Sequence, residues 1–226
     1  MNKLHKFLVL FALFIVPLIF YIFLQLGTHN FGKLAVISKD VADVSLIDSQ
    51  YKFQGKISVV IFLGDDLKVS NAEVFNLNEK IYKKFYGYTD FQLIAFVSEG
   101  KQAEIEKLKK KLSINTNLVK WNFIFTSEQE MQAIHESFKT SEDVLDSNFH
   151  ISKAYLIDKE KGLRRGKSTI KAQEDENLFG YNMKSVAELK NDMHDDIKVV
   201  LAEYSFALKK NNTDERRKQS ISNEKK

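Results

Sequence analysis

The sequence contains no cysteine, and its only proline is Pro17, in 226 residues. The absence of cysteine excludes disulfide bonds, thiol redox chemistry, cysteine nucleophiles and thiolate metal sites. Strings typical of other catalytic classes are also missing, because there is no G-x-S-x-G of serine hydrolases and no glycine-rich phosphate-binding loop of either common form. These absences favour binding over catalysis, and we predict that the protein is not an enzyme.

The body of the chain carries no excess of positive charge. The formal net charge is +4, and residues 209–226 hold seven basic and three acidic residues. Without this tail and the two N-terminal lysines, 25 basic residues face 27 acidic ones. That balance argues against nucleic acid as a partner. The tail is polar and lacks apolar periodicity, so we predict that it is disordered, with its basic residues either solvated or touching anionic lipid.

One long apolar run stands near the N-terminus. Residues 7–24, FLVLFALFIVPLIFYIFL, are 18 residues without a charge, enough at about 1.5 Å per residue to cross a hydrocarbon core of about 30 Å. A cleaved signal peptide and a buried helix are the alternatives, but the run exceeds a usual signal core and no small-residue cleavage site follows it. We therefore predict a retained transmembrane anchor.

The anchor sets the predicted organisation of the chain. Lys3 and Lys6 precede the run, and by the positive-inside rule they place the rest of the protein outside the cytoplasm. The prediction is a single-pass protein of the inner (cytoplasmic) membrane whose domain faces the periplasm or extracytoplasmic space. Its segments are a cytoplasmic N-terminus (1–6), the transmembrane helix (7–26), a spacer (27–33), one folded domain (34–208) and the tail (209–226).

The folded domain is organised around residues 55–73, GKISVVIFLGDDLKVSNAE. The apolar run from Ile57 to Leu63 is too short for a helix and predicts a strand buried on both faces of a sheet. A turn follows at Gly64, Asp65 and Asp66. Ser70, with Glu73 three residues later, has the pattern of a capping box and predicts the start of a helix.

The rest of the domain alternates strands with helices. Apolar runs predict strands at 34–38, 91–97, 120–125 and 149–158, with a weaker candidate at 44–47 and a hairpin partner at 163–165. Apolar stripes predict helices through 74–85, 105–112, 131–138 and 186–204. The third of these helices is predicted to begin with a capping box formed by Ser127 and Glu130. Residues 166–180 are predicted to form a loop. The pattern predicts a single α/β sandwich with a mixed central sheet.

Several local strings, taken in order, resemble the SCO/SenC family, membrane-tethered thioredoxin-fold proteins that deliver copper to cytochrome oxidase. They are Gly55-Lys56 before the buried strand, WNFIFT at 121–126, His150 five residues before YLID at 155–158, GLR at 162–164 and Asp196-Ile197 in the closing helix. The resemblance spans about residues 50–205. It implies a thioredoxin-like sandwich and a role in cytochrome oxidase assembly.

The chain departs from that family at its reactive corner. The family's CxxxC positions, matched from Gly55-Lys56, fall on Leu67 and Asn71, and Val97–Gly100 replaces its aspartate-bearing string. Because copper(I) favours thiolate and thioether sulfur, most metal affinity is lost with the cysteines. The resemblance then implies a non-catalytic interaction module. Its expected partner is a membrane-embedded respiratory protein or a cysteine-bearing SCO-like relative.

His150 is the one family ligand that this sequence retains. In one hypothesis it binds copper or another transition metal together with Asp65 and Asp66, as a metallochaperone or electron-transfer accessory. In the other it is a hydrogen-bonded imidazole where a loop enters a strand, the two aspartates form a solvated turn, and no cofactor is bound. A third hypothesis is an unrelated anchored α/β binding domain. His135 and His194 are expected on polar helix faces.

Overall fold

A computed structural model describes residues 3–26, 33–65, 67–173 and 176–207. The chain divides into two compact units, Met1–Gly32 and Lys33–Lys226, which are described separately. Residues 27–32 of the predicted spacer and the whole predicted tail lie outside the described residues, as does Asp66.

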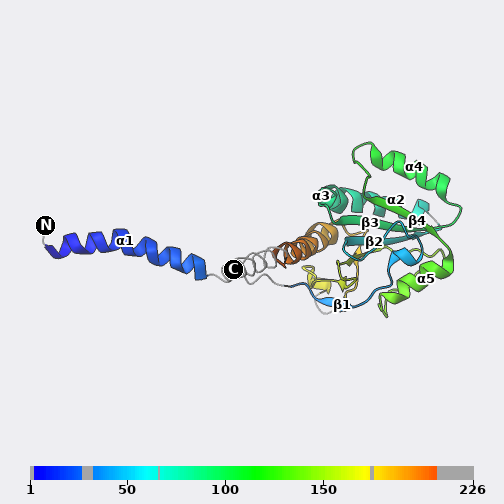
Figure 1. Ribbon diagram of the computed structural model, residues 1–226. Coiled ribbons are helices and arrows are strands. Elements are labelled where there is room, and N and C mark those ends of the chain that lie inside the picture. Colours follow the sequence, from blue (N-terminus) through cyan, green and yellow to red (C-terminus); the bar gives the residue numbers. More distant parts are fainter. Residues whose placement is uncertain (1–2, 27–32, 66, 174–175, 208–226) are drawn as a thin grey trace, which may run out of the picture. The chain divides into compact units, whose positions relative to one another are not determined.

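The first unit is the helix α1, Lys3–Leu26 (Figure 1). Its segment His5–Phe23 is long and apolar enough to cross a membrane, and none of it is buried against protein. Pro17 lies inside the helix. An apolar helix that buries none of its side chains in protein is what a bilayer would cover, so this unit is consistent with the predicted anchor.

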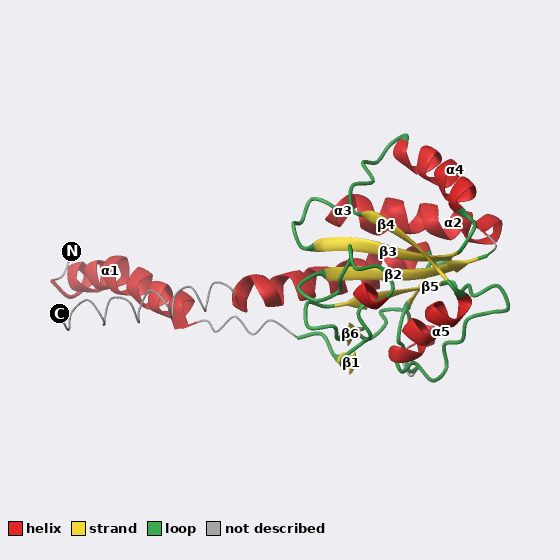
Figure 2. Ribbon diagram, turned by 45° about the vertical axis from the view of Figure 1, so that its right-hand side comes forward, coloured by secondary structure: helices red, strands yellow, loops and turns green. Residues whose placement is uncertain are grey.

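The second unit is built on one mixed sheet (Figure 2). Its strands, in chain order, are β1 (Val36–Ser38), β2 (Ile57–Gly64), β3 (Phe91–Ser98), β4 (Trp121–Thr126), β5 (Lys153–Ile157), β6 (Leu163–Arg164) and β7 (Tyr181–Asn182). They lie in the order β1-β6-β5-β2-β3-β4, with β7 paired to β5. Strands β2, β3 and β4 are parallel, whereas β5, β6 and β1 pair antiparallel. The predicted mixed sheet is confirmed.

Helices cover both faces of this sheet. They are α2 (Leu67–Leu77), α3 (Lys83–Phe85), α4 (Gln102–Ser113), α5 (Glu128–Ser137) and α6 (Val186–Glu188). A single π-helical turn, η2 (Asn78–Tyr82), joins α2 to α3, and another, η4 (Leu189–Met193), continues α6 into a helix that runs to residue 207. Short 3₁₀ turns stand at Val44–Leu46 (η1) and Lys171–Gln173 (η3).

The alternation of side chains along β2 explains the two layers. Val59 and Ile61 face a core shared with α2, α4 and the closing helix, whereas Val60 and Phe62 face a core shared with α5 and residues 41–53. All residues of β2 are buried, as the apolar run predicted. The unit β2–α2–β3, followed by the β5–β6 hairpin and the closing helix, gives the thioredoxin-like sandwich that the sequence predicted.

Some local predictions were wrong. The weaker strand candidate at 44–47 is the turn η1, because the Asp43 carboxylate caps it through Ser45 N (3.1 Å) and also accepts from Phe53 N (3.0 Å). Strand β5 begins at Lys153, four residues later than expected, and β7 was not foreseen. The capping box of Ser127 and Glu130 is confirmed.

The two ends of the sheet have different surroundings. Leu34, near the start of the domain, donates its backbone N–H to Glu203 of the closing helix (2.7 Å). The next residue of that helix, Tyr204, lines a hollow together with Ile57, the first residue of β2. The turn after β2 therefore lies at the opposite end of the sheet from the point where the domain begins.

Candidate functional site

The candidate site lies at the corner formed by the C-terminal end of β2 and the start of α2. Gly64 turns the chain with a φ of +60°, and a Cβ there would come within 1.9 Å of the Asn148 carbonyl oxygen. Asp65 N donates to the same oxygen (2.9 Å). Only glycine permits this approach together with a positive φ. The contact brings residues 148–150 against the corner, as the sequence predicted for His150.

His150 is held in this corner by two carboxylates. Its side chain is 7% exposed, and Nε2 lies 2.9 Å from Glu73 Oε2. Its backbone N–H donates to Asp146 Oδ1 (3.0 Å), and Nδ1 lies 3.7 Å from Asp146 Oδ2. A carboxylate only accepts hydrogen bonds, so Nε2 carries a proton in the bond to Glu73. One of the two ring nitrogens of His150 is therefore engaged within the protein, which leaves Nδ1 as the nitrogen that a metal could use.

Glu73 is the buried acid of the corner, with 2% of its side chain exposed. Burial by itself would raise its pKa, but hydrogen bonds from His150 and from Ser152 (2.8 Å), and the charges of His150 and Lys184, lower the pKa of Glu73 below its ordinary value. Its two oxygens are thus used by protein donors, and the carboxylate stays ionised inside the fold.

The role of Glu73 was missed from the sequence. The predicted capping box is wrong, because α2 begins at Leu67, so that Ser70 falls in its first turn and bonds back to the Leu67 carbonyl (3.4 Å). Glu73 then lies on the buried stripe that continues through Leu77. Glu73 lies three residues after Ser70 and four before Leu77, and both of these residues are buried. This helical spacing was the signal that could have identified Glu73 as a buried acid.

The two positions matched to the family's cysteines differ in their surroundings. Leu67 is 4% exposed and belongs to the core beneath α2, whereas Asn71 is half-buried on the same helix. Asp65 is exposed and pairs with Lys101 (3.0 Å). The third predicted ligand, Asp66, lies outside the described residues. Within the described part of the chain, no group of three or more His, Asp and Glu side chains is arranged to hold a metal ion. The metal site stays a prediction.

The closing helix anchors a second buried cluster that the sequence did not reveal. Arg165 is fully buried, with Nη2 3.0 Å from Glu188 Oε1 and its guanidinium 4.0 Å from the Tyr181 ring centroid. Asp196, part of the Asp-Ile pair of the resemblance, accepts from Gly166 N (2.8 Å) and Tyr181 Oη (2.7 Å). These bonds fasten the polar 166–180 segment to the helix.

The expectation for His135 was wrong. Its residue exposure is 3%, and its ring centroid lies 5.1 Å from that of Phe62 in the core beneath α5. His194 is partly exposed, and its ring lies 5.3 Å from Phe85. A histidine among apolar stripe residues can face either way, since its ring is apolar at one edge and polar at another.

No protein-family model matches the sequence, and no curated protein matches it. Solved structures do. BsSco, a member of the Sco family of cytochrome c oxidase assembly proteins, shares 13% identity at a TM-score of 0.46, over 74% of this chain and 94% of that one. ScoI of Bradyrhizobium japonicum with copper bound shares 12% at 0.37, over 61% and 83%. The thioredoxin domain of a thiol-disulfide oxidoreductase from Bacteroides vulgatus shares 14% at 0.35, over 61% and 86%. The Sco family, which the sequence resembles, is thus among the proteins to which this chain is structurally similar.

Proposed function

We propose that this protein is a membrane-anchored, extracytoplasmic interaction module on a Sco-like, thioredoxin-type scaffold, without metal or redox chemistry. The observation that carries the proposal is the pairing of His150 with Glu73 at 2.9 Å. His150, the one family ligand that the sequence retains, is hydrogen-bonded to Glu73. Leu67 packs in the core at a position where the resemblance places a thiolate. With no cysteine in the chain, recognition of a partner is the function left to the domain.

The partner follows from the resemblance and from the anchor. A domain tethered by α1 meets membrane proteins at high effective concentration, so weak contacts suffice for assembly. We propose a membrane-embedded respiratory protein, in assembly or regulation of a cytochrome oxidase, or a cysteine-bearing SCO-like chain. The scaffold would present its corner surface, with exposed Asp65 and half-buried Lys101 beside it, to that partner.

Copper(I) competition on the full chain in detergent tests the first half of the proposal. Without thiolates we expect no binding that withstands a strong copper(I) chelator. Retention of copper(I) at picomolar or tighter affinity would overturn the proposal. A thiol-disulfide exchange assay should likewise show no turnover by the protein.

Photo-crosslinking in native membranes tests the second half. A photoreactive side chain at Asp65 should capture a specific membrane protein, and one at Ile114 should not, because Ile114 is 76% exposed but follows α4 at the other end of the sheet. Equal capture from both positions, or none from Asp65, would contradict recognition at the corner.

The alternative, a metallochaperone or electron-transfer accessory, keeps one structural argument. Asp146 lies 3.7 Å from His150 Nδ1 and its side chain is 52% exposed, so a hard ion could reach both groups from solvent. Calorimetry with zinc, manganese and copper(II) separates the two functions. Metal binding by the native protein that is lost in His150→Ala would favour the alternative. The absence of any heat of binding with the native protein would exclude it.

A further inference from the structure

A polar hollow lies at the end of the sheet opposite the corner, where α3 meets the segment that follows α4. Its volume is about 490 Å³, within the range of about 300–1,000 Å³ that is usual for small-ligand sites. The lining combines one aromatic ring with amide and hydroxyl groups and a lysine; its residues are Lys83, Tyr86, Ser113, Asn115, Thr116 and Asn117. These groups determine which ligand the hollow would bind.

The π-helical turn η2 holds one wall of this hollow in place. Asn78 Nδ2 donates to Thr116 Oγ1 (3.0 Å). Tyr82 Oη donates to the Asn117 carbonyl oxygen (2.9 Å) and accepts from Lys120 N (3.0 Å). Asn78 and Tyr82 are both buried, and π-helical turns are frequent at functional sites. The wall is therefore ordered before a ligand arrives, which lowers the entropic cost of binding.

Tyr86 supplies the aromatic surface of the hollow. Buried Tyr82 stacks on one face of its ring, with centroids 5.6 Å apart and an angle of 20° between the planes. Tyr86 is 36% exposed. Since Tyr82 covers one face, the part of the ring that lines the hollow is the other face and the edge. The face of an aromatic ring is electron-rich and attracts the weakly positive C–H groups of a saturated ring.

The amide and hydroxyl side chains provide both donors and acceptors. Asn117 Oδ1 accepts from Val119 N (3.2 Å), which leaves Nδ2 as a donor. The Asn115 amide hydrogen-bonds no group within the described residues, so it can donate and accept. Ser113 Oγ donates to the Lys110 carbonyl oxygen (3.0 Å) and keeps its lone pairs as acceptors. This set fits a ligand whose own groups both donate and accept.

The charges around the hollow favour a neutral ligand. Lys83 is the only lining residue with a charge at pH 7, and it pairs with Glu79 one turn earlier (2.5 Å). A cation would find no carboxylate in the lining, and an anion would compete with Glu79 for Lys83. Several further lysines on the flanking segments do not line the hollow: Lys80, Lys84, Lys110, Lys111 and Lys120.

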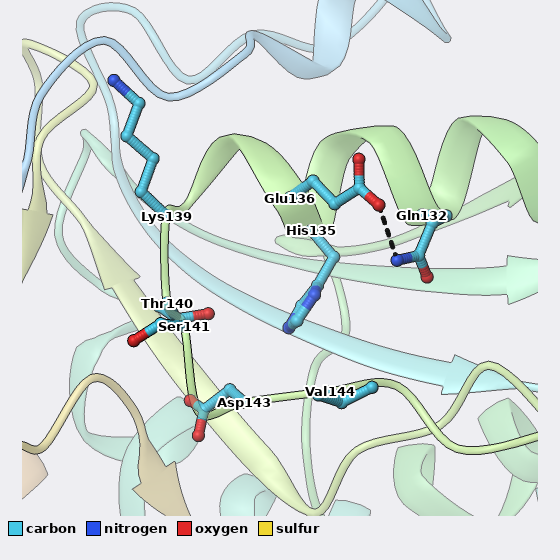
Figure 3. A pocket seen from close by; sticks show the side chains of 8 residues that line it. All are labelled: Gln132, His135, Glu136, Lys139, Thr140, Ser141, Asp143 and Val144. Atoms are coloured by element: carbon cyan, nitrogen blue, oxygen red, sulfur yellow. Dashed lines mark hydrogen bonds between the residues drawn. The ribbon is translucent and has the colours of Figure 1, made fainter.

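A second hollow, beside α5, has a different lining. Its volume is about 360 Å³, and Glu136 and Asp143 contribute carboxylates to it (Figure 3). Gln132 donates to Glu136 (2.9 Å), and Lys153 pairs with Asp143. The aromatic ring of its lining, that of His135, belongs to a residue that is only 3% exposed. This hollow lacks an open aromatic surface and serves as an internal comparison.

We propose that the hollow beside α3 binds a pyranose ring of a neutral sugar, with its C–H face on Tyr86 and its hydroxyl groups bonded to Asn115 and Asn117. Each sugar hydroxyl donates one hydrogen bond and accepts others, as these amides require. The C–H face of the ring matches the aromatic surface. The site goes beyond the proposed function, because it uses none of the corner residues.

Saturation-transfer difference NMR tests the proposal on the full chain, in micelles of a detergent without a sugar headgroup. The probes are the methyl β-glycosides of glucose, galactose and N-acetylglucosamine. At least one should receive saturation on its ring protons, and transfer should saturate with concentration. Cyclohexanol, a saturated ring with a single hydroxyl group, should receive none, and inorganic phosphate should not displace the sugar. Transfer to none of the three glycosides, or displacement by phosphate, would overturn the proposal.

Two variants locate the binding. Tyr86→Ala removes the aromatic surface, and sugar binding should be lost. Asn117→Asp keeps the acceptor for Val119 N but removes the free donor, so affinity should fall about fivefold, the effect of one neutral hydrogen bond. Tyr88→Ala, at a tyrosine 50% exposed and outside this lining, and Gln132→Ala, in the second hollow, should bind like the native protein.

The emission of Trp121 shows whether each variant is folded, because this residue lies in the core. Undiminished binding in folded Tyr86→Ala, or an equal loss in Tyr88→Ala, would refute the assignment. Asn117→Asp changes an exposed side chain without changing its size, so it tests the site even if Tyr86→Ala does not fold. Native affinity in Asn117→Asp would also contradict the site.

Chain length distinguishes a free sugar from a sugar unit of a glycan. The probes are the β-1,4-linked disaccharide and tetrasaccharide of N-acetylglucosamine. An affinity at least about tenfold above that of the methyl glycoside would identify a glycan as the ligand. Equal affinity would identify a single sugar.

Discussion

Replacing His150 with alanine is the sharpest test of the corner. The substitution removes the donor that lies 2.9 Å from Glu73 Oε2 and leaves a carboxylate that is 2% exposed. Ser152 still donates to the other oxygen (2.8 Å). Lys184, at 3.5 Å, has a side chain 64% exposed, so solvent screens most of its contribution. The variant therefore isolates the cost of a buried, half-satisfied carboxylate.

The expected cost is about 3 kcal/mol. Leaving a buried charge such as the Glu73 carboxylate without a partner costs about 3–5 kcal/mol, and the remaining bond from Ser152 favours the lower end. Since a domain of this kind has a total stability of about 5–15 kcal/mol, the loss is a large fraction of it. In equilibrium terms it lowers the folded-to-unfolded ratio more than hundredfold, because 1.4 kcal/mol is tenfold.

Urea unfolding of the full chain in micelles measures this cost, with fluorescence of the single tryptophan as the probe. Trp121 is 5% exposed and packs in the core, so its emission reports on the domain and not on the anchor. His194→Ala is the matched control, because its partner Asp195 is 68% exposed. The control should lose less than about 1 kcal/mol.

The slope of stability against pH should differ in sign between the native protein and the His150→Ala variant. In the native protein the pKa of Glu73 is lowered, so its contribution is present above the unfolded value of 4.5 and is lost as pH falls through the folded pKa. In His150→Ala burial should raise that pKa, and stability should then increase as pH falls toward 4.5. A cost below about 1 kcal/mol, or an unchanged slope, would show that the pair does not hold the corner.

Three further substitutions test other parts of the fold by thermal or urea unfolding. Arg165→Met should cost about 3 kcal/mol or more, because it strands buried carboxylates; an unchanged midpoint would contradict the cluster. Gly64→Ala should destabilise strongly, since φ is +60° and its Cβ would lie 1.9 Å from a carbonyl oxygen, whereas Gly87→Ala, with nothing within 4 Å, should be tolerated. Ser127→Ala should cost about 1 kcal/mol by removing the confirmed cap, and no change would mean that the cap is not formed in solution.

Local features were predictable from the sequence. The apolar run of β2 and that of β3 became fully buried strands, because five consecutive apolar residues in each, 59–63 and 93–97, can be satisfied only inside a sheet covered on both faces. The cap at Ser127 formed as expected, because both of its partners lie within one helical turn. The same pattern at Ser70 failed, since α2 starts earlier, at Leu67.

The partner of His150 in the corner and the direction in which His135 faces were both decided by tertiary structure. Glu73 and His150 are 77 residues apart, and Tyr155 and His135 are 20 apart, so no local spacing announces either contact. Each pair exists because parallel strands and the β5 connection bring distant segments to one place, where a buried polar group must find a partner in the protein. The sequence by itself determined the main strands and helices, the anchor-like helix and the absence of thiol chemistry. Only the packed fold decided which acid His150 meets and which way His135 faces, because those outcomes depend on desolvation and on neighbours far along the chain.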